Sequence, residues 1–424
     1  MANEKWIGLS LGTDIDWPAC FEAMMRRLAP SFGTGKGRFE VKVRRILMDP
    51  FFLTDPSKYV LVVDRLTHWF KFAREWLKKA ALMNDVYLLN NPFTFQSMEK
   101  HSAFCAMERL GIKIPTTVLL PQKEYPKNSP AYAKTTARYN LLFDLDEIAD
   151  KVGYPLYMKP YDGGGWRGVT RVADSAELHQ AYDESGTEIM HLQRAVEPFD
   201  VFVRALAIGP QVMPMRYDAT QPLHARYVVD HDFLSPKMGR EVNILTKTIN
   251  AFFRWEYNSC EAIVQDEALY PIDFANACPD SSLTSLHYYF PFVVKSQLLW
   301  TLFCVATGRK MRRDLDFEPW FAVGDDRDLD YSEKLSRYEK LADEYFETAR
   351  FHAFCAKRFG DIDSVLLDFF ASAEFDDILC EKVRDIFPAR EHDEFIAHFR
   401  GLVRMGAEGM FAPKAPGRGP RAGS

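Results

Sequence analysis

The chain has 424 residues, of which 47% are hydrophobic and 14% aromatic, so it can bury the cores of roughly two to four domains. Its formal net charge of −6 argues against a nucleic-acid partner, because nucleic-acid-binding proteins usually carry a basic patch. The seven cysteines are scattered and never spaced as Cys-x-x-Cys, which is typical of reduced thiols in a cytoplasmic protein and predicts no zinc site. No secretory signal is visible, and the most apolar segment, 290–306, is interrupted by Lys295 and Gln297. We therefore expect a buried helix there and no membrane partner.

The first ninety residues alternate between predicted strands and predicted helices. Helices are expected from Asp16 onward, with Pro18 in the first turn, and over 68–82. The strands are expected at 6–11, 41–48, 59–63 and 85–89. This alternation predicts an α/β N-terminal domain over residues 1–90 with parallel strand pairing.

The next part of the chain begins with Asn90-Asn91-Pro92. A helix containing Lys100 is expected over 95–110 and is ended by Gly111. An extended segment follows, then a polar, proline-spaced loop over 122–138 that could act as a lid. A short helix over 144–153 leads into the next motif.

The segment 154–172, YPLYMKPYDGGGWRGVTRV, carries the strongest chemical signal. A short apolar strand delivers Lys159 and then breaks into a loop that contains Gly163, Gly164, Gly165 and Gly168, before a second strand. Glycines can turn their amides toward a ligand, and a lysine adds a mobile charge that suits phosphate. The pattern predicts a hairpin that folds over a polyphosphate, the alternative being a glycine-rich surface hairpin without a ligand.

From residue 188 onward the pattern turns to β-strands. Three strands are expected in the segments IMHLQRAV, DVFVRALAIG and QVMPMRYD, then a helix over 237–257 and two strands over 261–264 and 268–274. After Gly308 the helical period dominates, with helices expected over 330–359, 362–370, 375–386 and 391–405. We expect a helical C-terminal region over 309–411 and a disordered tail over 412–424, because that tail has nothing to bury.

In their order and spacing, these motifs resemble the ATP-grasp superfamily, and most closely its carboxylate–amine ligases, which include glutathione synthetase, D-alanine–D-alanine ligase and RimK-like enzymes. The resemblance covers about 6–292, is strongest over 91–279 and is absent from the helical C-terminus. It implies a fold of mixed α/β and α+β class. An α/β pre-ATP-grasp domain would precede central and nucleotide-binding domains over 91–308, with the helical region added.

The resemblance also implies a nucleotide site. Two family lysines match Lys100 and Lys159, which would contact the phosphates of ATP. The glycine loop at Gly163, Gly164 and Gly165 would cover them. Adenine would be read by the backbone of Gln193, Arg194, Ala195 and Val196, and the ribose would be held by Asp200. Taken alone, Lys100 could lie on a solvated helix face and Asp200 could be a turn residue.

Two arginines follow the adenine-reading segment. At its strand position Arg216 resembles the family arginine that contacts the transferred phosphoryl group, and a planar guanidinium suits such an oxyanion. By simple alternation Arg204 is expected to face the same way and to contact a substrate carboxylate. The alternative for both is an arginine on the surface of a strand.

The family's metal motif is matched with a departure. Glu261 occupies the first acid position, and Asp273 and Asn276 stand where the family has Glu-x-Asn, with Asp in place of Glu and one extra residue. Side chains two apart on a strand share a face, whereas side chains three apart do not. Asp273 and Asn276 can therefore hold one Mg²⁺ only if the strand ends or bulges near 274–276. The polar segment 280–285 resembles the part of the ligases that lies close to the acceptor substrate.

The resemblance implies an ATP- and Mg²⁺-dependent ligase that joins a carboxylate to an amine through an acyl phosphate. Its substrates would be small molecules or peptides, and formation of a homo-oligomer is left open. Two alternatives stay open as well. One is an ATP-grasp kinase that phosphorylates a hydroxyl, and the other is an ATP-binding scaffold or regulator that has lost turnover.

Overall fold

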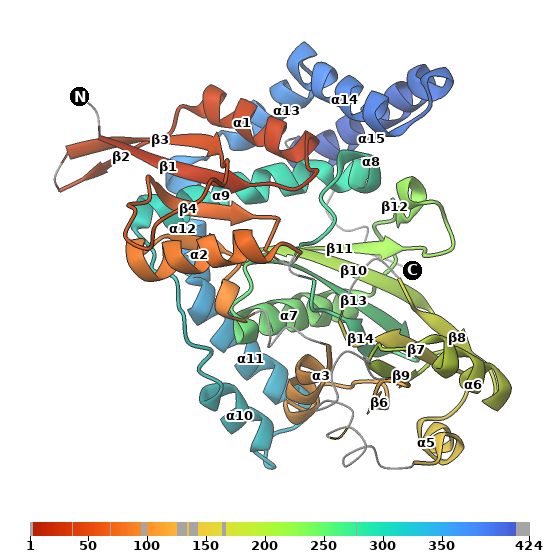
Figure 1. Ribbon diagram of the computed structural model, residues 1–424. Coiled ribbons are helices and arrows are strands. Elements are labelled where there is room, and N and C mark those ends of the chain that lie inside the picture. Colours follow the sequence, from red (N-terminus) through yellow and green to blue (C-terminus); the bar gives the residue numbers. More distant parts are fainter. Residues whose placement is uncertain are drawn as a thin grey trace, which may run out of the picture.

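The computed structural model describes residues 3–412 except 36, 68, 95–99, 125–133, 135–142, 163–166 and 277. Its architecture confirms the expected fold class, since an α/β layer is followed by two mixed α/β units and a helical C-terminal region (Figure 1). The glycines Gly163, Gly164 and Gly165, most of the loop over 122–138 and the tail after residue 412 lie outside the described residues.

The N-terminal domain contains a five-stranded sheet in the order β2-β3-β1-β4-β5. The predicted parallel pairing is confirmed, because β1 pairs in parallel with β3 and β4, and β4 with β5. The edge strand β2 is antiparallel to β3 and was not expected, since its sequence Ser-Phe-Gly-Thr is short and carries one large apolar residue. The elements are β1 (Asn3–Ser10), α1 (Asp16–Leu28), β2 (Ser31–Thr34), β3 (Gly37–Arg45), β4 (Tyr59–Asp64), α2 (Lys71–Asn84) and β5 (Tyr87–Leu89).

A four-stranded antiparallel sheet in the order β6-β9-β7-β8 follows and has a hydrophobic core of its own. The hairpin predicted around the glycine loop is confirmed in its strands, because β7 and β8 pair directly. The elements of this unit, with the helix that precedes it, are α3 (Lys100–Arg109), β6 (Thr117–Leu120), α5 (Leu145–Val152), β7 (Leu156–Pro160), β8 (Thr170–Val172), α6 (Ser175–Glu184) and β9 (Met190–Arg194).

The second antiparallel sheet has the order β12-β11-β10-β13-β14, and helix α7 packs on one of its faces. The predicted end of that helix at residue 257 is wrong. The helix stops at Phe253 because Arg254 adopts a left-handed conformation, and Tyr257 already begins the next strand. The elements are β10 (Val201–Ile208), β11 (Gln211–Tyr217), β12 (Tyr227–Val228), α7 (Pro236–Phe253), β13 (Tyr257–Gln265) and β14 (Ala268–Asp273).

The remaining helices pack beside the N-terminal domain and the second antiparallel sheet (Figure 1). Helix α11 lies beside α7, and α14 lies beside α1. Among them, α10 was not expected, and α15 runs to Phe411 rather than 405. They are α8 (Leu283–Leu286), α9 (Phe290–Thr307), α10 (Glu318–Asp325), α11 (Tyr331–Phe346), α12 (Thr348–Arg358), α13 (Ile362–Phe370), α14 (Ala373–Ile386) and α15 (His392–Phe411). Short 3-10 helices occur at Leu223–Ala225, His287–Tyr289 and Ala389–Glu391.

Among the residues that the structure describes, one segment, Leu283–Thr307, is long and apolar enough to cross a membrane by length and composition. In the fold, 78% of its most apolar window is buried. It contains α9, which packs against α1, α12, α15 and strand β4. This segment is therefore a core helix, as the interrupting Lys295 and Gln297 predicted.

The buried carboxylate of Glu256 joins the N-terminal sheet, the second antiparallel sheet and the helical region. It accepts hydrogen bonds from the Tyr87 hydroxyl at 2.7 Å, the Trp300 indole at 2.9 Å and the Tyr345 hydroxyl at 2.8 Å, and it lies 3.3 Å from the Arg309 guanidinium. A buried carboxylate is costly unless it is paired and hydrogen-bonded, and this one is both. The helical region is thus fixed to the rest of the chain by polar contacts as well as by a shared hydrophobic core.

Candidate functional site

Strand register places Arg204, Glu261 and Asp273 on one face of the second antiparallel sheet. Arg204 on β10 stands opposite Glu261 on β13, and Glu261 stands opposite Asp273 on β14. Directly opposed residues of antiparallel strands project to the same side. Nη1 of Arg204 lies 3.5 Å from Oε1 of Glu261, and both side chains are 11% exposed.

A bulge in β14 is what brings Asp273 to that face. Ala262 pairs with Pro271 but Glu261 pairs with Asp273, so Ile272 is one extra residue between the two pairs. The strand ends at Asp273, and 274–276 leave strand geometry. The requirement that the chain end or bulge in this region is confirmed. Asn276 donates its side-chain amide to Oγ of Ser259 at 2.9 Å, two residues before Glu261 on the same strand.

The facing wall of the site comes from the four-stranded sheet. Nζ of Lys159 donates to Oε1 of Gln193 at 2.7 Å and to the backbone oxygen of the bulged Ile272 at 3.0 Å, so this one ammonium group joins the two sheets. Gln193 in turn donates to Oγ1 of Thr117 at 2.8 Å, which fixes its orientation. Burial lowers the pKa of Lys159 to about 8, with Asp273 opposing the shift and Lys100 adding to it.

Lys100 completes the charge arrangement from helix α3. Its Nζ lies 3.2 Å from Oδ2 of Asp273, and its side chain is only 9% exposed, so the solvated-face alternative for this lysine is wrong. Three cations from three elements therefore surround two carboxylates, leaving a positive excess. Such an excess of fixed positive charge suits a polyphosphate. Burial raises the pKa of Glu261, and Arg204 opposes that shift.

The expectation that Arg204 and Arg216 face the same way is wrong. The register pairs Arg204 with Met215 and Arg216 with Val203, so the two arginines lie on opposite faces of the sheet. Arg216 is 48% exposed and forms an ion pair with Asp230 at 2.8 Å. A signal in the sequence could have shown this, because a two-residue turn at Gly209-Pro210 fixes the register. Only glycine fits at 209, where φ is 56° and an added Cβ would meet the Trp300 ring at 2.3 Å.

The predicted adenine and ribose residues lie at the end of β9 and the start of β10. The backbone amides of Arg194 and Ala195 donate to the carbonyls of Thr116 and Pro155, at 2.9 and 3.0 Å. Adenine recognition would therefore fall to other backbone groups of this segment. Oδ2 of Asp200 accepts the Asp266 amide at 3.1 Å, which supports the β13–β14 turn.

His191 was missed by the sequence reasoning and lies directly opposite Lys159. Burial lowers its pKa to about 3, and the nearby Lys159 acts in the same direction, so the ring is neutral. It stacks on His101 at 5.4 Å between ring centroids and meets the edge of Phe104 at 5.8 Å. The period-two pattern of β9 could have pointed to it, because residue 191 shares a face with Gln193.

The residues present fit a magnesium ion. Two carboxylates on opposed strands, with an amide side chain nearby, supply the hard oxygen ligands that Mg²⁺ prefers. Burial, with a smaller contribution from the facing Asp273, raises the pKa of Glu261, and a bound cation would favour its charged form. Within the described ranges, no group of three or more His, Cys, Asp or Glu side chains is placed to hold a metal. Two carboxylates suffice for Mg²⁺, which usually keeps several waters and substrate phosphates as its other ligands.

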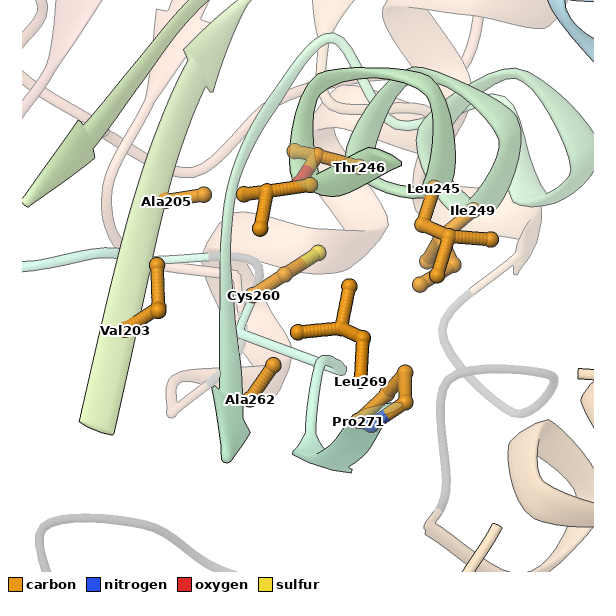
Figure 2. Close-up of a pocket in the computed structure, with 10 residues that line it drawn as sticks. Val203, Ala205, Leu245, Thr246, Ile249, Cys260, Ala262, Leu269 and Pro271 are labelled. Carbon is orange, nitrogen blue, oxygen red and sulfur yellow. The ribbon is translucent and has the colours of Figure 1, made fainter. Parts of the chain in front are cut away.

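A small cavity lies between the other face of the sheet and α7. Its volume is about 10 Å³ and its walls are almost wholly apolar. Figure 2 shows the lining side chains between the strands and α7. A space of that size has room for about one water, and a water needs two or more polar partners. The cavity is therefore part of the core. Its lining residues include Val203, Ala205, Leu245, Ile249, Cys260 and Ala262.

No protein-family model matches the chain, and no curated protein matches it. Among solved structures it is similar to a RimK-domain ATP-grasp protein from Sphaerobacter thermophilus, with 14% identity, a TM-score of 0.43, and coverage of 66% of this chain and 93% of that one. D-alanine–D-alanine ligase from Bacillus anthracis complexed with ATP has 13% identity, a TM-score of 0.44 and coverage of 82% and 99%. Macrocyclase MdnC from Microcystis aeruginosa, bound with precursor peptide MdnA, has 13% identity, a TM-score of 0.45 and coverage of 69% and 97%.

Proposed function

We propose that this protein is a cytoplasmic ATP-dependent ligase that forms an amide between a carboxylate and an amine, on small-molecule or peptide substrates. The observation that carries the proposal is the convergence of Lys100, Lys159 and Arg204 on the carboxylates of Glu261 and Asp273. These groups come from a helix and two separate sheets. They would provide phosphate-binding cations and metal-binding acids in one place.

In the proposed reaction, an oxygen of the donor carboxylate attacks the γ-phosphorus of ATP. The bond from that phosphorus to the β,γ-bridging oxygen breaks, which gives ADP and an acyl phosphate. The amine nitrogen then attacks the acyl carbon, the carbon–oxygen bond to phosphate breaks, and the amine gives up its excess proton. The products are an amide, ADP and inorganic phosphate.

The protein's own residues act mainly by position and charge. Lys100 and Lys159 would hold the phosphates, and the guanidinium of Arg204, rather than that of Arg216, would stabilise the transferring oxyanion. The rings of Tyr217 and Tyr227 lie 5.4 and 5.7 Å from the Arg204 guanidinium, and they hold it in place without neutralising it. A preorganised cation in a site closed to water stabilises developing negative charge strongly.

Glu261, Asp273 and Asn276 would hold Mg²⁺, which supplies charge neutralisation at the phosphates when bound. The glycine hairpin between β7 and β8 would close over the nucleotide. Exclusion of water is needed because an acyl phosphate hydrolyses readily.

A second candidate is an ATP-binding scaffold or regulator without turnover. The departure from the family's Glu-x-Asn spacing is the observation that favours it, since it changes the metal ligands. A kinase acting on a hydroxyl is the third alternative, because the same phosphate-binding groups would serve it.

One experiment separates the three. The protein is incubated with ATP and Mg²⁺ and with pooled carboxylates and amines, and ADP and inorganic phosphate are measured in parallel. A ligase releases both in equal amounts, and only when both pools are present. A kinase releases ADP without inorganic phosphate. A scaffold binds ATP and releases neither, and that result would overturn the proposal.

A further inference from the structure

Large apolar side chains are exposed on the N-terminal domain, on two short segments. The first segment, 46–57, joins β3 to β4, and the second, 66–72, leads into α2. Single exposed apolar residues are normal, whereas a group of them calls for an explanation. The side chains of this group, which we call the apolar surface, are Leu47 (87% exposed), Phe52 (78%), Leu53 (73%), Trp69 (50%), Phe70 (59%) and Phe72 (53%).

The two segments pack on each other. The ring of Phe51 in the first segment lies 5.6 Å from the ring of Phe72 in the second, measured between their centroids. Farther along α2, Nζ of Lys79 donates to the backbone oxygen of Asp55 in the first segment. The exposed side chains of the two segments therefore belong to one surface rather than to two separate spots.

Hydrogen bonds hold both segments in fixed turns. In the first turn, Oδ2 of Asp55 accepts the Phe52 amide at 2.8 Å, and the Asp55 amide donates to the Phe52 carbonyl at 3.2 Å. In the second, the amides of Trp69 and Phe70 donate to the Leu66 carbonyl at 3.0 and 2.9 Å. The apolar side chains are thus presented to the solvent by an ordered backbone, which limits the entropy that binding would cost.

The apolar surface is set among positive charges. The stretches 44–58 and 69–79 contain seven Lys or Arg and three Asp or Glu, although the whole chain has a net charge of −6. Counting the ion pair of Arg45 with Glu22 as neutral still leaves an excess of three positive charges. Lys58 and Lys71 are exposed beside the apolar side chains. Protruding apolar groups among lysines are complementary to an apolar layer with an anionic face.

Two other occupants fit this surface less well. The last residues, 413–424, contain Lys414, Arg418 and Arg421 but no acid and no large apolar residue, so they offer neither opposite charge nor apolar area. A second copy of the chain in a two-fold contact would bring the same positive charges of both copies together, and like charges oppose association. A side chain as exposed as that of Phe52 or Leu53 also protrudes, which suits insertion between lipid headgroups.

We propose that the apolar surface binds the face of an anionic lipid bilayer, with Phe52 and Leu53 inserted among the headgroups and Lys58 and Lys71 beside the lipid phosphates. The chain then lies on the membrane without spanning it. The expectation of no membrane partner was based on the lack of a spanning segment, and a contact of this kind needs none. Its strength depends on the apolar area that is buried and on the attraction between the lysines and anionic lipid.

The test measures how much of the full chain is pelleted with lipid vesicles. The vesicles contain phosphatidylcholine alone or phosphatidylcholine with about one third phosphatidylglycerol, which is anionic. We expect the wild type to bind the anionic vesicles and to be released from them as the salt concentration rises, because salt screens the lysines. It should bind the neutral vesicles roughly tenfold more weakly or worse, because the lysines then meet no net lipid charge.

The double variant Phe52→Ser with Leu53→Ser removes the inserted side chains and leaves the backbone hydrogen bonds of the turn possible. We expect it to bind anionic vesicles roughly tenfold more weakly or worse, while its unfolding transition in urea stays like that of the wild type. Leu223→Ser with Ile386→Ser is the matched control, because these side chains are 56% and 46% exposed but lie outside the apolar surface. We expect it to bind both kinds of vesicle like the wild type.

Two kinds of result would overturn this inference. The first is a wild type that does not bind anionic vesicles, or that binds them no better than the variant Phe52→Ser with Leu53→Ser. The second is a dimer in sedimentation velocity without lipid that the same variant abolishes, because a second copy would then cover the surface. Neither result bears on the proposed ligase, whose formation of ADP is measured without lipid.

Discussion

Lys159 offers the sharpest test of nucleotide binding, because its ammonium group joins the two walls of the site. Replacing it with methionine keeps a long apolar stem beside Phe104, whose ring lies 5.2 Å from the ammonium, and removes only the charge and its donors. In the free protein the ammonium makes two hydrogen bonds, at 2.7 and 3.0 Å. When ATP binds, these would give way to contacts with phosphate oxygens.

A hydrogen bond to a charged group contributes about 1.5–3 kcal/mol. Lys159→Met should therefore weaken AMP-PNP binding by roughly 10- to 150-fold, as measured by calorimetry. Lys151→Met is the matched control. Lys151 lies near the end of α5 in the same part of the fold, is exposed and pairs with Glu147 at 2.7 Å. It should bind AMP-PNP like the wild type.

The pH dependence gives a second readout on the same variant. Burial lowers the pKa of Lys159 to about 8, so in the free protein it loses its proton as the pH rises above that value. Only the charged form attracts phosphate. Wild-type affinity for AMP-PNP should therefore fall by up to about tenfold per pH unit above pH 8, a slope absent from Lys159→Met. Unchanged affinity in the variant, or equal slopes in the two proteins, would refute the role of Lys159.

Four further predictions follow from the site and the core. Arg204→Gln should lower the rate of ADP formation by about 10²-fold or more, because it removes a preorganised cation. Arg216→Gln should leave the rate nearly unchanged. A larger loss in Arg216→Gln than in Arg204→Gln would show that the site lies on the face of the sheet that carries Arg216. Asp273→Asn should keep the fold and some ATP affinity but lose most turnover. In calorimetry its AMP-PNP binding should no longer depend on Mg²⁺. Equal Mg²⁺ dependence in the wild type and the variant would mean that Asp273 is not a metal ligand. Glu256→Gln should reduce the free energy of unfolding in urea by about 3 kcal/mol, because it leaves the buried guanidinium of Arg309 with only the partly exposed carboxylate of Glu347, 3.5 Å away. A smaller change would mean that Glu347 and the neutral hydrogen bonds suffice. Truncation after Arg309 should give an insoluble or unfolded chain, because α11 and α14 complete the core; a soluble protein with full turnover would contradict this.

The sequence contained the local features of the fold in a readable form. The parallel N-terminal strands follow from apolar runs separated by an amphipathic helix. The β13–β14 turn follows from the polar residues 265–267, of which Asp266 and Glu267 have φ values of 49° and 58°. The spacing of Asp273 and Asn276 even required an irregular strand end, and the bulge at Ile272 together with the end of β14 provides it.

Features that depend on pairing between distant segments could not be read in the same way. Simple alternation placed Arg204 and Arg216 together, but the pairing of β10 with β11 puts them on opposite faces, since a change of one residue in register moves every side chain to the other side. The hydrogen-bond partners of Glu256 lie far from it and from one another along the chain. No local pattern indicates that Tyr87, Trp300 and Tyr345 converge on one carboxylate.

The sequence by itself indicated most of the elements, their order and the lysines and acids of the candidate site, because these depend on periodicity, turn residues and motif spacing within short stretches. Only the tertiary structure decided which charges meet. Lys159 reaches the carbonyl of Ile272, Lys100 reaches Asp273, and Arg204 reaches Glu261. The physical reason is that a Coulomb interaction depends on distance and burial, and both are set by how two sheets and a helix pack rather than by separation along the chain.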